Sequence, residues 1–222
     1  MSVAAVAFDM DGVLIDSERV WADAREQVAR ESGGRWKPDT QERMMGMSSP
    51  EWSRFMHDEL GVPMAPAEIS ASVVERMAAR YREHVPLLPH AREAVERLGE
   101  RWPLAVASSS NRPLIELVLE LAGLAHLLRV TVSSEEVPRG KPAPDVYLEA
   151  ARRLEVEPAS CAAIEDSTNG ILAAAAAGMP VIAVPRPDYP PSAAALAQPA
   201  AVLSSLAELT PRVVEQAAGS TA

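Results

Sequence analysis

The sequence predicts an α/β protein with a doubly wound parallel sheet of Rossmann-like type and an inserted all-helical domain. Three observations support this fold class. Val3 to Phe8 is a short apolar run that stops at acids and Gly12, which is typical of a strand buried on both faces of a parallel sheet. Residues 16–86 show only helical patterns, and strand and helix patterns alternate after Pro86.

The inserted segment predicts three helices. Apolar residues recur at helical spacing from Asp16 or Ser17 to residue 31, from 48 to 60 and from 67 to 84. The second of these begins with Ser48 and Glu51, which match a capping box. We therefore assign residues 1–15 and 87–222 to a Rossmann-like core and residues 16–86 to a helical second domain.

The alternating part predicts a regular order of elements. The expected helices cover residues 90–99, 113–121, 144–154 and 168–177, and the expected strands cover 103–107, 130–132, 161–164 and 181–184. A weaker pattern follows, with an edge strand at 201–203 and a helix at 206–217 that Pro211 interrupts. Such a sheet brings its strand ends to one edge, where ligands bind.

Composition excludes several classes of function. The 222 residues carry a net charge of -10, which argues against general binding to nucleic acid or to anionic membranes. Cys161 is the one cysteine, so there is no disulfide framework. No apolar stretch near 18 residues is free of charges, and the N-terminus lacks a basic flank. We expect a cytoplasmic protein, monomeric or at most a weak dimer.

Four acids stand in two pairs at the ends of predicted strands. Asp9 and Asp11 follow the first strand, and Glu165 and Asp166 follow the strand at 161–164. Carboxylates held close together raise one another's pKa until a metal or a proton relieves them. A magnesium site is the natural interpretation, and magnesium usually accompanies phosphate.

Two further segments suggest phosphate binding. Ser108, Ser109, Ser110 and Asn111 end one predicted strand and open a helix, where backbone N–H groups and hydroxyls can hold an anion. Capping of that helix by Ser110 or Asn111 is the structural alternative. Lys141 lies between a glycine and a proline in a chain that has only one other lysine, Lys37, which favours a role for a compact point charge.

These four segments, in this order, resemble the motifs of the haloacid dehalogenase-like phosphatases, the family of the β-phosphoglucomutases. The resemblance implies that Asp9 is the nucleophile, that Asp11 is the general acid and base, and that Lys141 neutralises the nucleophile and the phosphate. It also implies that Ser108 binds phosphate, assisted by the Ser109 amide and by Asn111.

The same resemblance implies the ligands of Mg²⁺. Asp9, Asp166 and the backbone carbonyl of Asp11 would bind the ion directly, and Glu165 would act through water. Dehalogenation is disfavoured because Asp11 is present. Phosphonate cleavage through a Schiff base is disfavoured because Lys37, the one lysine of the helical segment, lies in a predicted loop.

The helical insert corresponds to the cap of this family, which closes over the core and selects the leaving group. Its specificity loop corresponds to Met45, Gly46, Ser48 and Ser49, and we add Trp52 as a specificity residue. Ser49 stands where the mutases have their second-phosphate arginine, so Arg43 or Arg54 would have to replace it in a mutase.

We therefore expect a magnesium-dependent phosphatase that hydrolyses a small phosphorylated metabolite, preferably a sugar phosphate, through an aspartyl phosphate on Asp9. A phosphosugar mutase of the β-phosphoglucomutase type is the alternative within the family. A phospho-accepting or phosphate-ester-binding signalling domain is the alternative that is not an enzyme.

Overall fold

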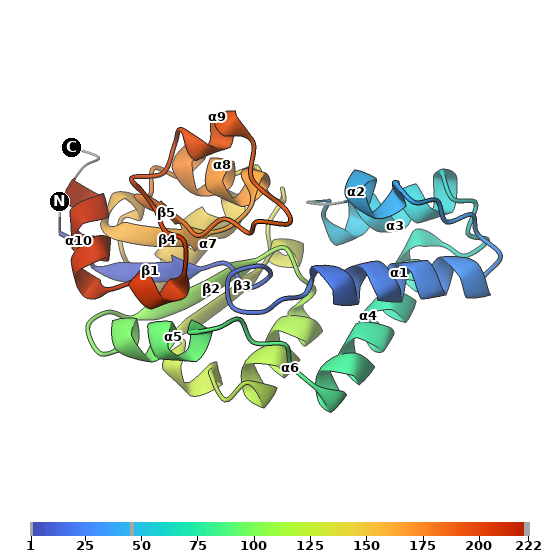
Figure 1. Ribbon diagram of the computed structural model, residues 1–222, viewed down its shortest axis with the longest axis horizontal. Helices are drawn as coiled ribbons and strands as arrows, with labels where there is room; N and C mark the ends of the chain where they lie inside the picture. Colours follow the sequence, from blue (N-terminus) through green and yellow to red (C-terminus); the bar gives the residue numbers. More distant parts are fainter. Residues whose placement is uncertain (1, 45–46, 220–222) are drawn as a thin grey trace.

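The computed structural model describes residues 2–44 and 47–219 and contains one six-stranded parallel sheet (Figure 1). Its strand order is β3-β2-β1-β4-β5-β6, and all neighbouring strands in it run parallel. The strands are β1 (Ala5–Phe8), β2 (Leu104–Ser108), β3 (Val130–Ser133), β4 (Cys161–Glu165), β5 (Val181–Ala183) and β6 (Ala201–Val202). The predicted doubly wound α/β fold is confirmed.

Helices cover both faces of the sheet because successive residues of its central strands point to opposite sides. Val6 and Phe8 of β1 belong to a core shared with α5, α6 and α10, whereas Ala5 and Ala7 face α7 and α8. These helices are α5 (Ala91–Gly99), α6 (Arg112–Leu121), α7 (Asp145–Leu154), α8 (Thr168–Ala176) and α10 (Pro211–Gly219). The central strands are therefore buried on both faces, as a continuous apolar run predicts.

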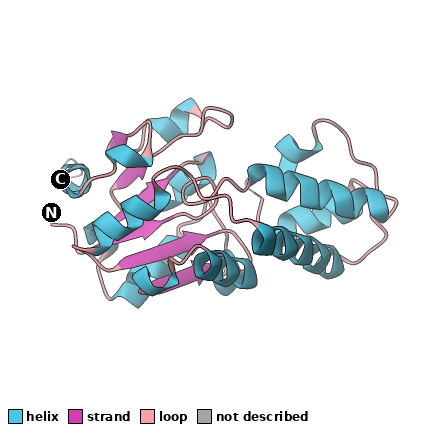
Figure 2. Ribbon diagram, turned by 60° about the horizontal axis from the view of Figure 1, so that its bottom comes forward, coloured by secondary structure: helices cyan, strands magenta, loops and turns pink. Residues whose placement is uncertain are grey.

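Four helices lie between β1 and α5 in the chain and stand beside the sheet (Figures 1 and 2). They are α1 (Glu18–Glu31), α2 (Thr40–Met44), α3 (Ser49–Asp58) and α4 (Pro66–Glu83), and we call them the cap helices. Trp21 of α1 and Trp52 of α3 meet edge to face with ring centroids 6.0 Å apart. This pair joins the buried face of α4, to which Val73 and Met77 contribute.

The two connections between the cap helices and the sheet run side by side. The Asp16 amide donates to the Pro86 carbonyl at 2.8 Å, and the Leu88 amide donates to the Leu14 carbonyl at 2.9 Å. These bonds hold the cap helices at the edge where the parallel strands end (Figure 1). The division of the chain at residues 15/16 and 86/87 is consistent with this path and stays an interpretation.

Several short elements, and the start of the last helix, differ from the predicted order. The short helices α2 and α9 (Ala193–Leu196) were not expected, because four or five residues give no clear periodicity. Pro211 does not interrupt a helix but begins α10, and residues 206–208 form a separate 3-10 turn. Proline suits the first helical turn, where its missing N–H is not needed. Within the described part of the chain, none of the helices is long and apolar enough to cross a membrane.

Candidate active site

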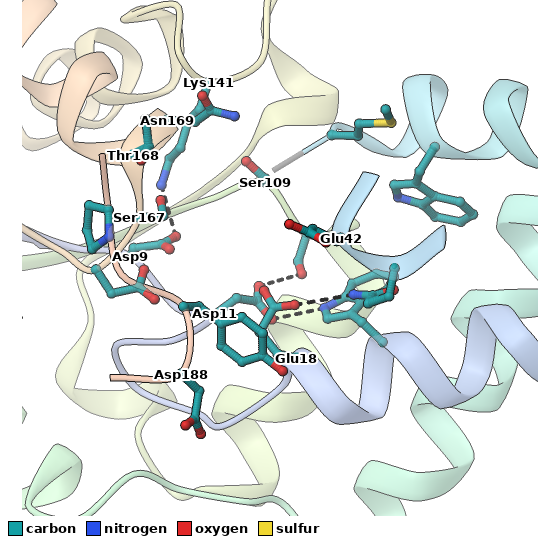
Figure 3. Close-up of a pocket in the computed structure, with 18 of the residues that line it drawn as sticks. Asp9, Asp11, Glu18, Glu42, Ser109, Lys141, Ser167, Thr168, Asn169 and Asp188 are labelled. Atoms are coloured by element: carbon teal, nitrogen blue, oxygen red, sulfur yellow. Dashed lines mark hydrogen bonds and ion pairs between the residues drawn. The ribbon is translucent and has the colours of Figure 1, made fainter. Parts of the chain in front are cut away.

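The centre of the site is a buried ion-pair network at the end of β1. Lys141 Nζ lies 2.9 Å from Asp9 Oδ1 (Figure 3). It also lies 2.6 Å from Glu165 Oε1. All three side chains are at least nine-tenths buried. Burial lowers the pKa of Lys141, but Asp9 and Glu165 outweigh it and raise that pKa, so the ammonium stays charged. Residues 132 positions apart in the chain thus form one electrostatic unit.

A cation fits beside this network. Ligand atoms of Asp9, Glu165 and Asp166 all lie within 4.8 Å of one another, and all three residues are buried. Asp166 Oδ1 is buried and accepts no hydrogen bond from any described residue, which leaves it free to bind an ion. Burial raises the pKa of Asp9 to about 8; Lys141 opposes this shift and Glu165 adds to it. A cation bound beside Asp9 would favour its ionised form, as Lys141 does.

Two glycines make room for these carboxylates. A Cβ atom on Gly12 would lie 1.9 Å from Asp166 Oδ2, and a Cβ atom on Gly170 would lie 1.8 Å from Glu165 Oε1. Gly12 also has φ +82°, which side-chain-bearing residues rarely adopt. The acids can gather at this edge because the loop after β1 and the first turn of α8 carry no side chain at these two positions.

Tyr147 is a member of the network that the motifs did not indicate. Its hydroxyl donates to Glu165 Oε1 at 2.7 Å and lies 3.3 Å from Lys141 Nζ. The residue is on α7, six positions after Lys141. The proline-rich loop that holds Lys141 and the first turn of α7 therefore place both side chains beside Glu165. Glu165 is thus held by two groups, and its other oxygen accepts the Asp166 amide at 3.1 Å.

Asp11 faces the cap helices rather than the acid cluster. Its Oδ1 accepts a hydrogen bond from Trp21 Nε1 at 3.1 Å, and its Oδ2 accepts one from Ser110 Oγ at 2.7 Å (Figure 3). Ser108 Oγ donates to the same Oδ2 at 3.3 Å. Trp21 was not singled out from the sequence, and Ser110 was considered only as an alternative helix cap, so neither contact was predicted.

The serine run divides between two tasks. Ser109 lines the cavity above Asp9, whereas the fully buried Ser108 hydroxyl accepts the Ser110 amide at 3.0 Å. Asn111 does not line this cavity: its Oδ1 accepts from Ser49 Oγ at 2.9 Å, and its Nδ2 donates to Glu135 Oε1 at 2.5 Å. Asn111 therefore links the core to the cap helices in this structure.

The cavity between the sheet edge and the cap helices measures about 740 Å³. Of the predicted specificity residues, Ser49 and Trp52 line it, and Met45 and Gly46 lie outside the described residues. Ser48 does not line it but begins α3, where the Ser48 amide donates to Glu51 Oε2 at 2.7 Å. A Cβ atom on Gly140 of the core would lie 3.4 Å from Ser48 Cβ, so cap and core are in close contact here.

A family profile of haloacid dehalogenase-like hydrolases matches residues 3–178. The chain belongs to this family. The resemblance seen in the four motifs is therefore confirmed.

Relatives of this haloacid dehalogenase-like hydrolase match along most of their length. "Probable pseudouridine-5'-phosphatase" of Drosophila melanogaster is 34% identical over 216 residues, which cover 94% of this chain and 92% of the relative. Hexitol phosphatase B of Escherichia coli is 36% identical over 192 residues, which cover 84% and 85%. Among solved structures, CbbY from Rhodobacter sphaeroides in complex with phosphate aligns with a TM-score of 0.87 at 26% identity, covering 96% of this chain and 99% of that one.

Arg25 is a further cavity residue of this hydrolase that the sequence did not single out. It lines the cavity from α1, and its guanidinium carbon lies 4.7 Å from the Trp21 ring centroid and 4.9 Å from that of Trp52. The two arginines considered from the sequence are elsewhere: Arg43 stacks on Phe55, and neither Arg43 nor Arg54 lines the cavity. Trp21 and Arg25 are four residues apart on one helix, and this spacing was the sequence signal that could have indicated that the two side chains lie together.

Proposed function

We propose that this hydrolase is a magnesium-dependent phosphatase that acts on a small phosphorylated metabolite, preferably a sugar or sugar alcohol phosphate. The observation that carries the proposal is the buried contact of Lys141 with Asp9 and Glu165, beside a cavity large enough for such a molecule. The relative named as a hexitol phosphatase supports the class of substrate. The fold alone would not identify the class of substrate, because one fold serves many reactions.

Magnesium suits the donor set. Hard carboxylate oxygens are the ligands this ion prefers, and it keeps several of its waters. Asp9, Asp166 and the Asp11 backbone carbonyl would hold it, with Glu165 acting through water; the unpartnered Asp166 Oδ1 supports this assignment. When bound, the ion supplies positive charge to the nucleophile and to the phosphoryl oxygens.

The side chains then divide the reaction into two steps. Hydrolysis of a phosphate monoester demands a barrier reduction on the order of 20 kcal/mol or more. Asp9 attacks the phosphorus in line and forms an aspartyl phosphate, while Lys141 stabilises the charge on the phosphoryl oxygens. Asp11 protonates the leaving oxygen and afterwards takes a proton from the attacking water. Ser109, which lines the cavity, would bind the phosphate through its hydroxyl and its backbone amide.

The cap helices would exclude bulk water and select the leaving group. The buried hydrogen bond between Ser49 of α3 and Asn111 of the core supports a closed arrangement. In this arrangement Asn111 serves the closure of the cap, and Ser108 orients Asp11 rather than contacting the cavity. Both roles modify the simpler assignment of these two residues as phosphate ligands.

The test is phosphate release with Mg²⁺ from a panel of sugar phosphates, sugar alcohol phosphates, nucleotides and phosphorylated acids. β-Glucose 1-phosphate is followed separately for isomerisation. We expect release from one class of ester and no isomerisation. Isomerisation without release would instead establish a mutase, and phosphorylation without turnover would establish a phospho-accepting domain. The cytoplasmic location and the monomeric state stay predictions from the sequence.

A further inference from the structure

We propose that Arg25 is a specificity-determining residue, whose guanidinium donates hydrogen bonds to hydroxyl oxygens of the leaving group at the end far from the phosphate. This inference rests on the proposed function and names the part of the molecule that recognises the rest of the substrate. It concerns a cap residue outside the four sequence motifs.

The position of Arg25 is fixed by aromatic packing. The guanidinium is within 5 Å of the centroids of both Trp21 and Trp52, and the residue is 6% exposed. Trp21 also donates to Asp11, so one tryptophan contacts both the proposed acid and the arginine. A planar cation held against two rings presents its N–H groups in a defined plane with little freedom to move.

The hydrogen-bonding capacity of Arg25 is unused. A guanidinium carries five N–H donors. Among the residues that the structure describes, none accepts a hydrogen bond from Arg25 or forms an ion pair with it, and its Nε is buried without a partner. Burial lowers the pKa of Arg25 to about 10, whereas the charges of Glu18 and Asp11 act to raise it, so the group is still charged at neutral pH. These two carboxylates offset part of the cost of burying the cation, but a buried donor without an acceptor is still costly, and a ligand oxygen in the cavity would offset that cost.

The charges around the cavity favour neutral hydroxyls over a second anion. Within the described part of the chain, the basic residues that line the cavity are Lys141 and Arg25. The acids Glu18, Glu42 and Asp188 line the same space, in addition to those of the catalytic cluster (Figure 3). A second phosphate or a carboxylate would meet this excess of negative charge, whereas hydroxyl groups can accept from Arg25 and donate to nearby carboxylates.

The experiment compares substrates whose leaving groups differ in length and hydroxyl content. Sorbitol 6-phosphate and glycerol 3-phosphate carry hydroxyls, whereas the leaving group of phenyl phosphate has no oxygen beyond the scissile one. For Arg25→Met we expect kcat/KM to fall roughly 10- to 100-fold on sorbitol 6-phosphate, mostly through KM, and to change less than about twofold on phenyl phosphate. Glycerol 3-phosphate should show a smaller loss.

The matched control is Arg43→Met. Arg43 is an arginine of the cap helices that stacks on Phe55 outside the cavity, so its replacement should leave kcat/KM unchanged on all three substrates.

A second variant and a binding measurement complete the test. Arg25→Lys keeps the charge but loses the planar guanidinium. Its kcat/KM on sorbitol 6-phosphate should therefore lie between that of the wild type and that of Arg25→Met. Calorimetric binding of sorbitol 6-phosphate with Mg²⁺ to Asp9→Asn and to the double variant Asp9→Asn, Arg25→Met needs no turnover. If the protein does not hydrolyse esters but this binding still depends on Arg25, the proposed function fails and the inference stands. Equal losses of kcat/KM on phenyl phosphate and sorbitol 6-phosphate would overturn the inference. A fourth substrate, 3-phosphoglycerate, carries a carboxylate, and a loss of kcat/KM that is largest on this substrate would also overturn it.

Discussion

Trp21 Nε1 on the first cap helix lies 3.1 Å from Asp11 Oδ1 in the core. The residue proposed as general acid and base is therefore oriented in part by a cap helix. Its other oxygen is held by Ser110, which belongs to the core. Movement of the cap helices would remove one of these donors and leave the other, so the position of Asp11 is coupled to cap closure.

Replacement of Trp21 by Phe tests this coupling. The change keeps an aromatic ring beside Arg25 and Trp52 but removes the N–H donor to Asp11. We expect kcat to fall roughly tenfold, the value of one hydrogen bond to a charged group, with a smaller change in KM. Steady-state kinetics on phenyl phosphate give the answer. An unchanged kcat would show that Ser110 and Ser108 are sufficient to orient Asp11.

Replacement of Tyr147 by Phe tests the support of Glu165. The Tyr147 hydroxyl donates to Glu165 Oε1 at 2.7 Å, so its removal leaves a buried carboxylate with one donor fewer. We expect the free energy of unfolding to fall by about 1–3 kcal/mol. The matched control is Tyr81→Phe, because the buried Tyr81 hydroxyl has no partner among the described residues. Chemical denaturation of both variants measures these losses. Equal losses of stability in Tyr147→Phe and Tyr81→Phe would contradict this account.

Replacement of Gly12 by Ala tests the space beside Asp166. The new Cβ atom would lie 1.9 Å from Asp166 Oδ2, so the carboxylate must move. Gly33 has a similar φ of +79° with nothing within 4 Å of a new Cβ atom, so Gly33→Ala isolates the backbone strain, about 1–2 kcal/mol. We expect Gly12→Ala to lose more stability than Gly33→Ala and to bind Mg²⁺ more weakly, as measured by calorimetry. Equal Mg²⁺ affinity in the two variants would argue against Asp166 as a ligand.

The raised pKa of Asp9 predicts how metal-free stability depends on pH. Burial raises that pKa from its ordinary value of 3.8 to about 8, so the folded protein holds this proton at pH values where the unfolded chain has released it. The associated stability is complete below about pH 4 and is lost as pH rises towards 8. Mg²⁺ favours the ionised acid, so the gain in melting temperature on adding Mg²⁺ to chelator-treated protein should be larger near pH 8 than near pH 6. A gain independent of pH would contradict this linkage.

The fold and the acid cluster could be predicted because both depend on strand ends. Short apolar runs that stop at Asp9 and at Glu165 locate one edge of a parallel sheet, and the topology brings these residues together. The contact of Lys141 with Asp9 agrees with the role that the resemblance implies, whereas its contact with Glu165 was not predicted. These conclusions need no knowledge of how the cap helices lie.

The role of the cap residues could not be predicted because it depends on how helices pack against the sheet. Periodicity identifies Trp21 as apolar-facing, but its contact with Asp11 requires the orientation of α1 relative to β1. Arg25 was hidden for the same reason, since a charged residue on a helix usually faces solvent. Asn111 was assigned to phosphate from its place in the serine run, whereas its side chain contacts Ser49 and Glu135.

The most direct measurement is acid quenching of the protein during turnover of a phosphate ester with Mg²⁺, followed by mass spectrometry of its peptides. The account predicts a phosphoryl adduct on Asp9 in the wild type, and neither adduct nor phosphate release in Asp9→Asn. Phosphate release at an undiminished rate by Asp9→Asn, or an adduct at another residue, would contradict the central claim.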